Sequence, residues 1–274
     1  MTKLSHLLPA AALLASPLAL AESFIPSQGD FSASIGVSFT TFDRFYAGDD
    51  LQPGVPGGGD IERLSYRGYF FYGLSDTVAL DFSIGYADIE SELDSQKEFA
   101  DTYVGLNWQF ADERNQGVDA LFRAGIIIEG SYETGQLSAP GDGENGADFS
   151  VRLRRSLGSE ALKGNVELGY TIYTGGNVPD TFRAKTGLQL ALGHGFSIDA
   201  SAIYFSATDG LDIGGPGFGG LGDLPQVQES GIAGEFGLAY ASPYGYYRLG
   251  YTELFDGENV GEEKTVGLSV SYTF

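Results

Sequence analysis

The chain ends on the stretch VGLSVSYTF (residues 266–274), in which large apolar residues alternate with small or polar ones. Successive side chains of a β-strand point to opposite faces, so this stretch predicts a strand with one apolar and one polar face. The same alternation recurs upstream, for example over 78–86, 100–110 and 118–128. A repeat of period two therefore dominates the chain, which is typical of an all-β fold.

Extended over the whole sequence, this pattern predicts twelve strands, most with the ~10 residues that a tilted strand needs to cross a bilayer. Short turns at 73–76, 193–195 and 241–244 alternate with longer connections at 46–60, 133–147 and 207–226. Bacterial outer-membrane barrels have this alternation, with the short turns in the periplasm. We therefore predict an all-β transmembrane antiparallel up-and-down β-barrel over 30–274. Its strands are expected near 30–45, 61–73, 77–89, 98–110, 118–132, 148–157, 165–174, 181–192, 196–206, 227–240, 245–255 and 263–274.

A soluble β-sandwich is the main structural alternative, because it shows the same period with its apolar faces turned inward. Glycines and charges of both signs on the polar faces favour the barrel. Aromatic residues at strand ends favour it as well, since aromatic girdles mark the membrane interfaces. These girdle candidates are Tyr72, Trp108, Phe110, Tyr132, Phe149, Phe182, Phe196 and Phe255.

The first residues have the layout of a secretory signal peptide. Lys3 supplies a positive charge, 7–20 is apolar, and Ala19-Leu20-Ala21 is a small-x-small cleavage site. An N-terminal anchor helix would need about 20 apolar residues, whereas Pro9 and Pro17 interrupt this stretch. We expect 1–21 to be cleaved, 22–29 to form a short periplasmic N-terminal segment, and the protein to reach the cell outer membrane.

Composition excludes several classes of protein. Fifteen basic against 37 acidic residues give a formal net charge of −22, which argues against binding of nucleic acid. A hydrophobic content of 42% and an aromatic content of 13% argue against a disordered acidic chain. The sequence contains no cysteine, so neither disulfides nor thiolate metal sites are expected.

Two stretches resemble known proteins. The ending Val270-Ser271-Tyr272-Thr273-Phe274 is similar to the C-terminal signal of outer-membrane proteins, which implies insertion by the barrel assembly machinery with Tyr272 and Phe274 as signal residues. The region 98–206 resembles outer-membrane transporters of the phenol-degradation (MetA-pathway) family in ADTYVGL (100–106), FRAG (122–125) and GNVELGY (164–170). That resemblance implies passage of small hydrophobic or aromatic compounds.

Charged residues fall on the polar parity of the predicted strands, which faces the lumen of a barrel. Two interpretations remain open: these charges pair with one another and fill the barrel, because an unpaired buried charge is costly, or they line a path for solutes. Twelve strands lie between filled and open barrels, so a narrow lumen is expected. The lumen candidates are Arg63, Arg67, Asp81, Asp101, Arg123, Arg152, Arg154, Glu167, Arg183, Lys185, Asp199, Glu235 and Arg248.

The connection 207–226 is rich in glycine yet carries apolar residues, and these make it a candidate gate. Its alternative role is that of a mobile surface loop. Its GPGFGG string (215–220) is no nucleotide motif, because no βαβ unit surrounds it. The gate candidates are Leu211, Ile213, Phe218, Leu221 and Leu224.

Catalysis and metal binding find little support in the sequence. Of the two histidines, His6 leaves with the signal peptide and His194 lies in a predicted periplasmic turn, so a general base is lacking. Acidic loops near 49–60, 142–148 and 256–263 contain no complete calcium motif, and an acidic outer rim is the alternative. We expect neither an enzyme nor a cofactor.

The sequence thus predicts an outer-membrane passive channel or transporter for small solutes. The alternative is a non-transporting structural or surface-interaction barrel with a closed, ion-paired lumen. The expected partners are outer-membrane lipid and lipopolysaccharide, the barrel assembly machinery and small solutes, and not nucleic acid.

Overall fold

The structure is a computed structural model that describes residues 24–54, 59–91, 94–134 and 138–274. The signal peptide predicted over 1–21 lies outside these residues. None of the described helices is long and apolar enough to cross a membrane.

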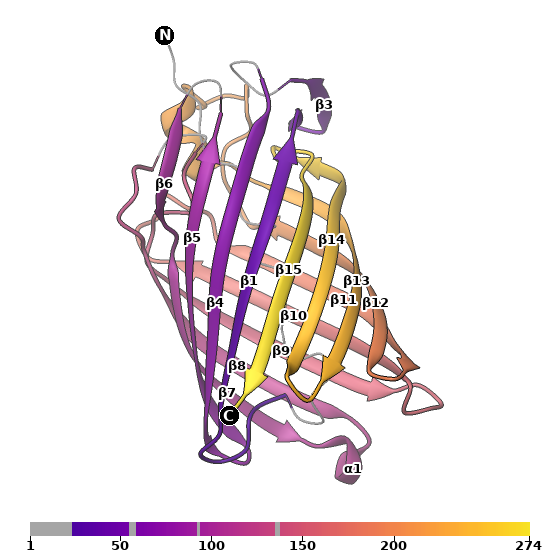
Figure 1. The fold of residues 1–274 in the computed structure, drawn as a ribbon. Coiled ribbons are helices and arrows are strands. Elements are labelled where there is room, and N and C mark those ends of the chain that lie inside the picture. Colours follow the sequence, from indigo (N-terminus) through magenta and orange to yellow (C-terminus); the bar gives the residue numbers. More distant parts are fainter. Residues whose placement is uncertain (1–23, 55–58, 92–93, 135–137) are drawn as a thin grey trace.

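The architecture is a closed, all-antiparallel barrel of twelve strands (Figure 1). Each strand pairs with its neighbours in sequence, and β1 pairs with both β4 and β15, so the sheet has no free edge in the wall. The wall consists of β1 (Phe31–Phe42), β4 (Ile61–Ser75), β5 (Val78–Glu90), β6 (Ser95–Phe99) with β7 (Thr102–Ala111), β8 (Asp119–Ile128), β9 (Gly146–Ser156), β10 (Leu162–Tyr173), β11 (Thr181–Gly193), β12 (Phe196–Ala207), β13 (Ser230–Ser242), β14 (Gly245–Glu258) and β15 (Lys264–Thr273).

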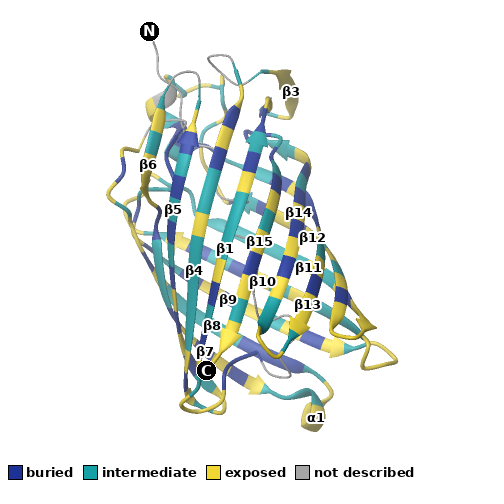
Figure 2. Ribbon diagram, viewed as in Figure 1, coloured by how far each residue is buried: buried dark blue, intermediate teal, exposed yellow. Residues whose placement is uncertain are grey.

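The alternation of the sequence becomes an alternation between lipid and lumen. On β15, Val266 and Leu268 are about half exposed on the outer surface, whereas Thr265 and Ser269 are buried inside. Figure 2 shows this banding of buried and exposed residues along the strands. Because the apolar face points outward, the sandwich alternative does not hold, and the period-two pattern reflects a lipid-facing surface.

Several local features differ from the sequence-based expectation. The strand expected over 98–110 is split into β6 and β7, and the one expected over 118–132 ends at Ile128. Three short elements were not predicted: the hairpin β2 (Arg44–Ala47) with β3 (Asp50–Pro53), helix α1 (Glu113–Gln116) and the 3-10 helix η2 (Leu221–Gln226).

After β8 the chain leaves the wall because two of its groups bind Asp101. Gly130 N and the Tyr132 hydroxyl both donate to Asp101 Oδ1, at 2.9 and 2.6 Å. These bonds turn the chain inward after β8, so Tyr132 is buried and its assignment to an outer girdle is wrong. The girdle candidates Tyr72, Trp108 and Phe255 are exposed on the outer surface.

An apolar cluster, here called the mouth cluster, fills the end of the barrel that carries the long connections, which is the end expected to be extracellular. Phe45 of β2 is 2% exposed, and it packs with wall residues that include Ile203 and Phe205 of β12. The β2–β3 hairpin therefore folds over and into the mouth. The cluster comprises Phe42, Phe45, Tyr46, Ile61, Ala87, Ile89, Ile203, Phe205, Ala233, Leu254 and Val260, with Ala47 and Ile213 packed against it.

Asn259, in the connection between β14 and β15, ties the mouth together. Its Oδ1 accepts from the backbone N–H groups of Gly48 (2.9 Å) and Ile213 (3.1 Å), and its Nδ2 donates to the Gln228 carbonyl (2.9 Å). The residue is fully buried and has a φ of +55°, a conformation that asparagine tolerates better than most residues. One side chain thus joins the β2–β3 turn to the 207–226 connection.

We expect Asn259→Ala to loosen the mouth while leaving the wall intact. The substitution strands two buried donors and one carbonyl, each at a cost of roughly 1–3 kcal/mol. Hydrogen exchange should accelerate over 44–54 and 211–228 but not in the β9–β11 wall. Asn259→Asp keeps the acceptor but buries a carboxylate beside the Gln228 carbonyl and the Asp212 carboxylate, so it should loosen the mouth at least as much. Equal protection in all three proteins would contradict this assignment.

Candidate functional site

The interior of the barrel holds two adjoining cavities. The upper cavity lies toward the mouth and is lined by Arg63, Asp101, Asp142 and the inner faces of β1, β4 and β15. The lower cavity, of about 240 Å³, is lined by most of the charged strand residues. Arg67, Tyr69, Tyr103 and Arg248 line both cavities and form the neck between them.

The lumen candidates are all in these two cavities, although their role in solute passage stays a prediction. Arg63 and Asp101 border the upper cavity, and Arg67 and Arg248 border both. The remaining candidates border the lower cavity: Asp81, Arg123, Arg152, Arg154, Glu167, Arg183, Lys185, Asp199 and Glu235.

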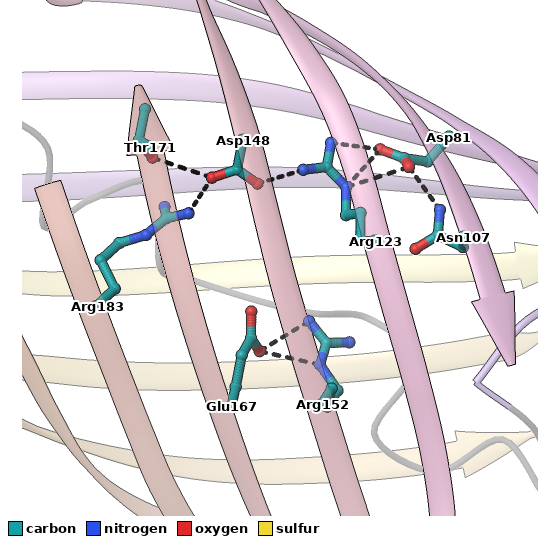
Figure 3. A network of polar contacts seen from close by, with 8 residues as sticks. All are labelled: Asp81, Asn107, Arg123, Asp148, Arg152, Glu167, Thr171 and Arg183. Carbon is teal, nitrogen blue, oxygen red and sulfur yellow. Dashed lines mark hydrogen bonds and ion pairs between the residues drawn. The ribbon is translucent and has the colours of Figure 1, made fainter. Parts of the chain in front are cut away.

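One chain of ion pairs runs from β5 to β11 (Figure 3). Arg123 Nη2 lies 2.8 Å from Asp81 Oδ2, and Arg123 Nη1 lies 2.5 Å from Asp148 Oδ1. Asp148 also pairs with Arg183 and accepts from Thr171 Oγ1. Each carboxylate oxygen in the chain has a charged or polar donor, so the charges compensate one another.

A second chain joins β11 to β14. Glu235 pairs with Lys185 and lies 2.5 Å from Arg248 Nη2, which in turn lies 2.6 Å from Asp199. Separate pairs join Arg152 to Glu167, Arg154 to Asp119, and Arg63 to Glu263. Removing one member of such a buried pair costs about 3–5 kcal/mol, because the other charge is left behind.

The opposite wall carries no charges at the same level. Below Phe42, the inner faces of β1 and β15 present only glycine, serine and threonine, among them Ser34, Gly36, Gly267 and Ser269. The lumen is therefore asymmetric, with charged and aromatic side chains on one side and open space beside a smooth wall on the other.

Asp101 and Asp142 form an acidic pair at the top of the upper cavity. Asp142 N donates to Asp101 Oδ2 at 3.0 Å, and the Tyr173 hydroxyl donates to the Asp142 carboxylate. Burial, and then the negative charge of Asp101, raise the pKa of Asp142 to about 7. The charge of the upper cavity therefore changes near neutral pH.

The N-terminal segment, expected in the periplasm, lies in the periplasmic end of the barrel. Phe24 and Ile25 are each 4% exposed and pack against Ala79 and Leu121. The Phe24 ring lies 4.5 Å from the Arg154 guanidinium carbon, a cation–π contact. Phe24 also lines the lower cavity, so this segment forms the periplasmic floor of the cavity.

Backbone contacts hold the segment where it crosses the rim. Gly29 N donates to the Gly73 carbonyl and Gly73 N donates to the Asp30 carbonyl, at 2.9 and 3.0 Å. A Cβ at position 73 would collide with the Ser27 carbonyl, so glycine is needed at this crossing. The apolar Phe24-Ile25 pair directly after the predicted cleavage site was the available sequence signal for this floor.

The gate candidates lie at the extracellular end, and the structure distributes them over two clusters. Ile213 packs against the mouth cluster, while Leu224 packs with Val227 in a small cluster that Phe218 also contacts. Leu211 pairs with Val227 through a β-bridge, and Leu221 begins η2. The β2–β3 hairpin, which the sequence pattern missed, contributes more buried apolar residues to the mouth than these candidates do.

The described residues also bear on the metal and enzyme hypotheses. Within them, no group of three or more His, Cys, Asp or Glu side chains is arranged to hold a metal ion. His194 lies exposed in the β11–β12 turn with a φ of +52°.

Comparison with known proteins gives a structural likeness only. No family model and no curated protein matches the sequence. The fold matches the COG4313 outer membrane channel from Pseudomonas putida F1 with a TM-score of 0.74 at 12% identity, covering 93% of this chain and 98% of that one. It matches the NanC porin with a TM-score of 0.50 at 10% identity, covering 88% of this chain and 98% of that one. This chain therefore has the twelve-stranded barrel fold that outer-membrane channels adopt.

Proposed function

We propose that the chain is exported by its signal peptide to the outer membrane of a Gram-negative cell and acts there as a passive channel for small solutes. The observation that carries this proposal is the pair of adjoining cavities inside a closed barrel. Segments outside the wall cover both ends of this space, namely the β2–β3 hairpin above and the N-terminal segment below. A structure with separate covers is suited to regulated passage and needs no catalytic group.

Hydrophobic or aromatic compounds are the solutes that we favour. Tyr69 and Tyr103 form part of the neck, and the mouth cluster would offer an apolar surface to an entering solute. The resemblance to phenol-degradation transporters points to the same class of compound. Lipid and lipopolysaccharide are the proposed surroundings of the exposed apolar belt.

A closed structural barrel is the second candidate, and the extent of ion pairing favours it. Both ion-pair chains and the buried Arg154–Asp119 pair would stabilise a barrel that conducts nothing. Conductance in planar bilayers distinguishes the two functions, provided that it is measured both on the intact barrel and on a barrel that lacks a cover.

Removal of the N-terminal floor should increase conductance. We expect a protein that keeps its signal peptide but lacks residues 24–28 to show several-fold higher single-channel conductance, because Phe24 and Ile25 no longer occupy the periplasmic end. Tyr244→Ala is a matched control, since this aromatic residue lies 82% exposed in the β13–β14 turn. If neither the intact nor the shortened barrel conducts, the closed structural barrel is the better description.

The ion selectivity of the channel should change with pH. Raising the pH from 6 to 8 ionises Asp142, whose pKa is about 7, and adds negative charge to the upper cavity. We expect permeability for anions relative to cations to fall across this range, and Asp142→Asn to abolish the change. The charged and titratable groups that interact with Asp142 include Asp101, Glu144, Arg183, Tyr103, Tyr132 and Tyr173.

The same titration affects stability with a definite sign. The folded pKa of Asp142 lies above the ordinary value of 3.8, so the folded state holds this proton more tightly. Its contribution to stability is fully present below about pH 4 and is lost as the pH rises through about 7.

Asp49→Asn, at an exposed position in the β2–β3 turn, is the control for the selectivity measurement and should leave both the selectivity and its pH dependence unchanged.

Recognition by the barrel assembly machinery is a further proposal, and Phe274 carries it. Its ring contacts Phe31 and Tyr272, and its backbone N–H donates to the Phe31 carbonyl beside the β1–β15 seam. Deletion of Phe274 should reduce the heat-modifiable fraction in outer-membrane preparations, whereas Phe274→Tyr should preserve it. Normal insertion of the deletion variant would contradict the role of this residue.

A further inference from the structure

The neck between the two cavities contains a cation without a matching carboxylate. Among the described residues, no carboxylate oxygen lies within 4.0 Å of the Arg67 guanidinium. Its contacts are Ser83 Oγ at 3.5 Å and the Tyr103 ring, whose centroid lies 5.8 Å from Arg67 Cζ. By contrast, Arg248, on the other side of the neck, is bound by both Asp199 and Glu235.

The register of the sheet places no carboxylate opposite Arg67. Its cross-strand neighbours are Gly36 on β1 and Gly85 on β5, and neither carries a side chain. For comparison, Arg152 lies directly opposite Glu167 and pairs with it. The Arg67 guanidinium lies over Gly85, and the residues beyond the two glycines are Ala100 and Ser269, which carry no charge. The guanidinium borders both cavities, where its N–H groups are available to a bound molecule.

The two carboxylates of the upper cavity have partners of their own. Asp101 accepts from Gly130 N, Tyr132 Oη and Asp142 N, and Asp142 accepts from Tyr173. These bonds hold both carboxylates in the loop that covers the cavity. Arg67 is therefore left to attract an anion from solution.

Aromatic surface adjoins this guanidinium. Tyr69 and Tyr103 line both cavities together with Arg67, and neither hydroxyl forms a hydrogen bond with any described residue. The wall beyond consists of Ser34, Gly36, Gly250 and Gly267, which leaves room beside the two rings. The site thus combines a planar cation, two free phenolic donors and aromatic faces next to a smooth wall.

We propose that Arg67, Tyr69 and Tyr103 form a binding site for a small aromatic monoanion such as an aryl carboxylate. The proposal rests on the proposed channel function and specifies its solute. The anionic group pairs with the Arg67 fork, which suits carboxylate geometry. The ring of the solute packs against the tyrosine rings, and such aromatic pairs are favourable in offset or edge-to-face arrangements.

Benzoate is the probe, and binding is measured by calorimetry on the full mature barrel in detergent. Arg67→Gln should lower benzoate affinity by about tenfold or more, as expected when a charge-assisted hydrogen bond is lost. Arg67→Lys keeps the charge but not the fork, and its affinity should be intermediate. Tyr103→Leu should reduce the preference for benzoate over acetate. Heat-modifiable mobility verifies that each variant is folded.

Lys163→Gln provides the charge-matched control. Lys163 lines the lower cavity and, like Arg67, has no carboxylate within 4.0 Å among the described residues, but it is not part of the neck. Its substitution should leave benzoate affinity within about twofold of the original, as for independent sites. An equal loss in Lys163→Gln and Arg67→Gln would show a diffuse positive potential and overturn the proposal. Equal affinity for benzoate, acetate and benzyl alcohol would overturn it as well.

The binding measurement is independent of conductance, so failure of this inference and failure of the channel proposal are distinguishable. If the barrel binds benzoate through Arg67 but neither the intact nor the shortened protein conducts, the binding-site proposal stands and the channel proposal fails. If the barrel conducts but its binding of benzoate does not depend on Arg67, the channel proposal stands and the binding-site proposal fails.

Discussion

The need to pair every backbone N–H and C=O group within the bilayer is the constraint on which the rest of the structure depends. Lipid offers no hydrogen-bonding partner, so a sheet that crosses it has to close. Here β1 closes the sheet by pairing with β15, in a register that puts Ile35 opposite Val270 and Gly36 opposite Ser269. Once this seam is fixed, each strand residue faces either lipid or lumen, and the polar residues of the strands face the lumen.

Closure also determines which lumenal charges find partners. A side chain inside the barrel reaches the residues opposite it on the two adjacent strands. Where such a residue is glycine, the side chain also reaches the strand beyond, as Arg123 reaches Asp81 over Gly105. Glu167 lies between Arg152 and Lys185 in the register, and Arg152 binds it. Arg67 lies between two glycines and binds no carboxylate among the described residues. The residues beyond those two glycines are Ala100 and Ser269, so the register supplies Arg67 with no carboxylate while it supplies partners to both ion-pair chains.

The sequence predicts the wall well because the wall is periodic. Alternation alone yields the twelve strands and the lumenal parity of residues such as Arg123 and Glu235. It fails where a segment is positioned by tertiary contacts, as in the β2–β3 hairpin, in which Phe45 is buried in the mouth cluster and pairs with Gly261. Tyr132 illustrates the same limit: it reads as a girdle residue until Asp101, 31 positions away in sequence, is seen to bind its hydroxyl. Pairing of Asp148 with Arg123 and Arg183 is likewise beyond sequence reasoning, because it depends on barrel geometry and not on parity.

Stability and permeability consequently depend on different residues. The ladders and the ion-pair chains hold the wall, and they stay satisfied whether or not the ends of the lumen are covered. The covers are held by contacts of their own. Above, these are the mouth cluster, the hydrogen bonds of Asn259 and the backbone bonds between β2 and residues 260–262. Below, they are the packing of Phe24 and Ile25 and the backbone bonds at Gly73. Displacing either cover breaks no hydrogen bond between wall strands. The barrel can therefore remain folded in lipid while access to its interior changes, and the residues that control access are those that the period-two pattern does not describe.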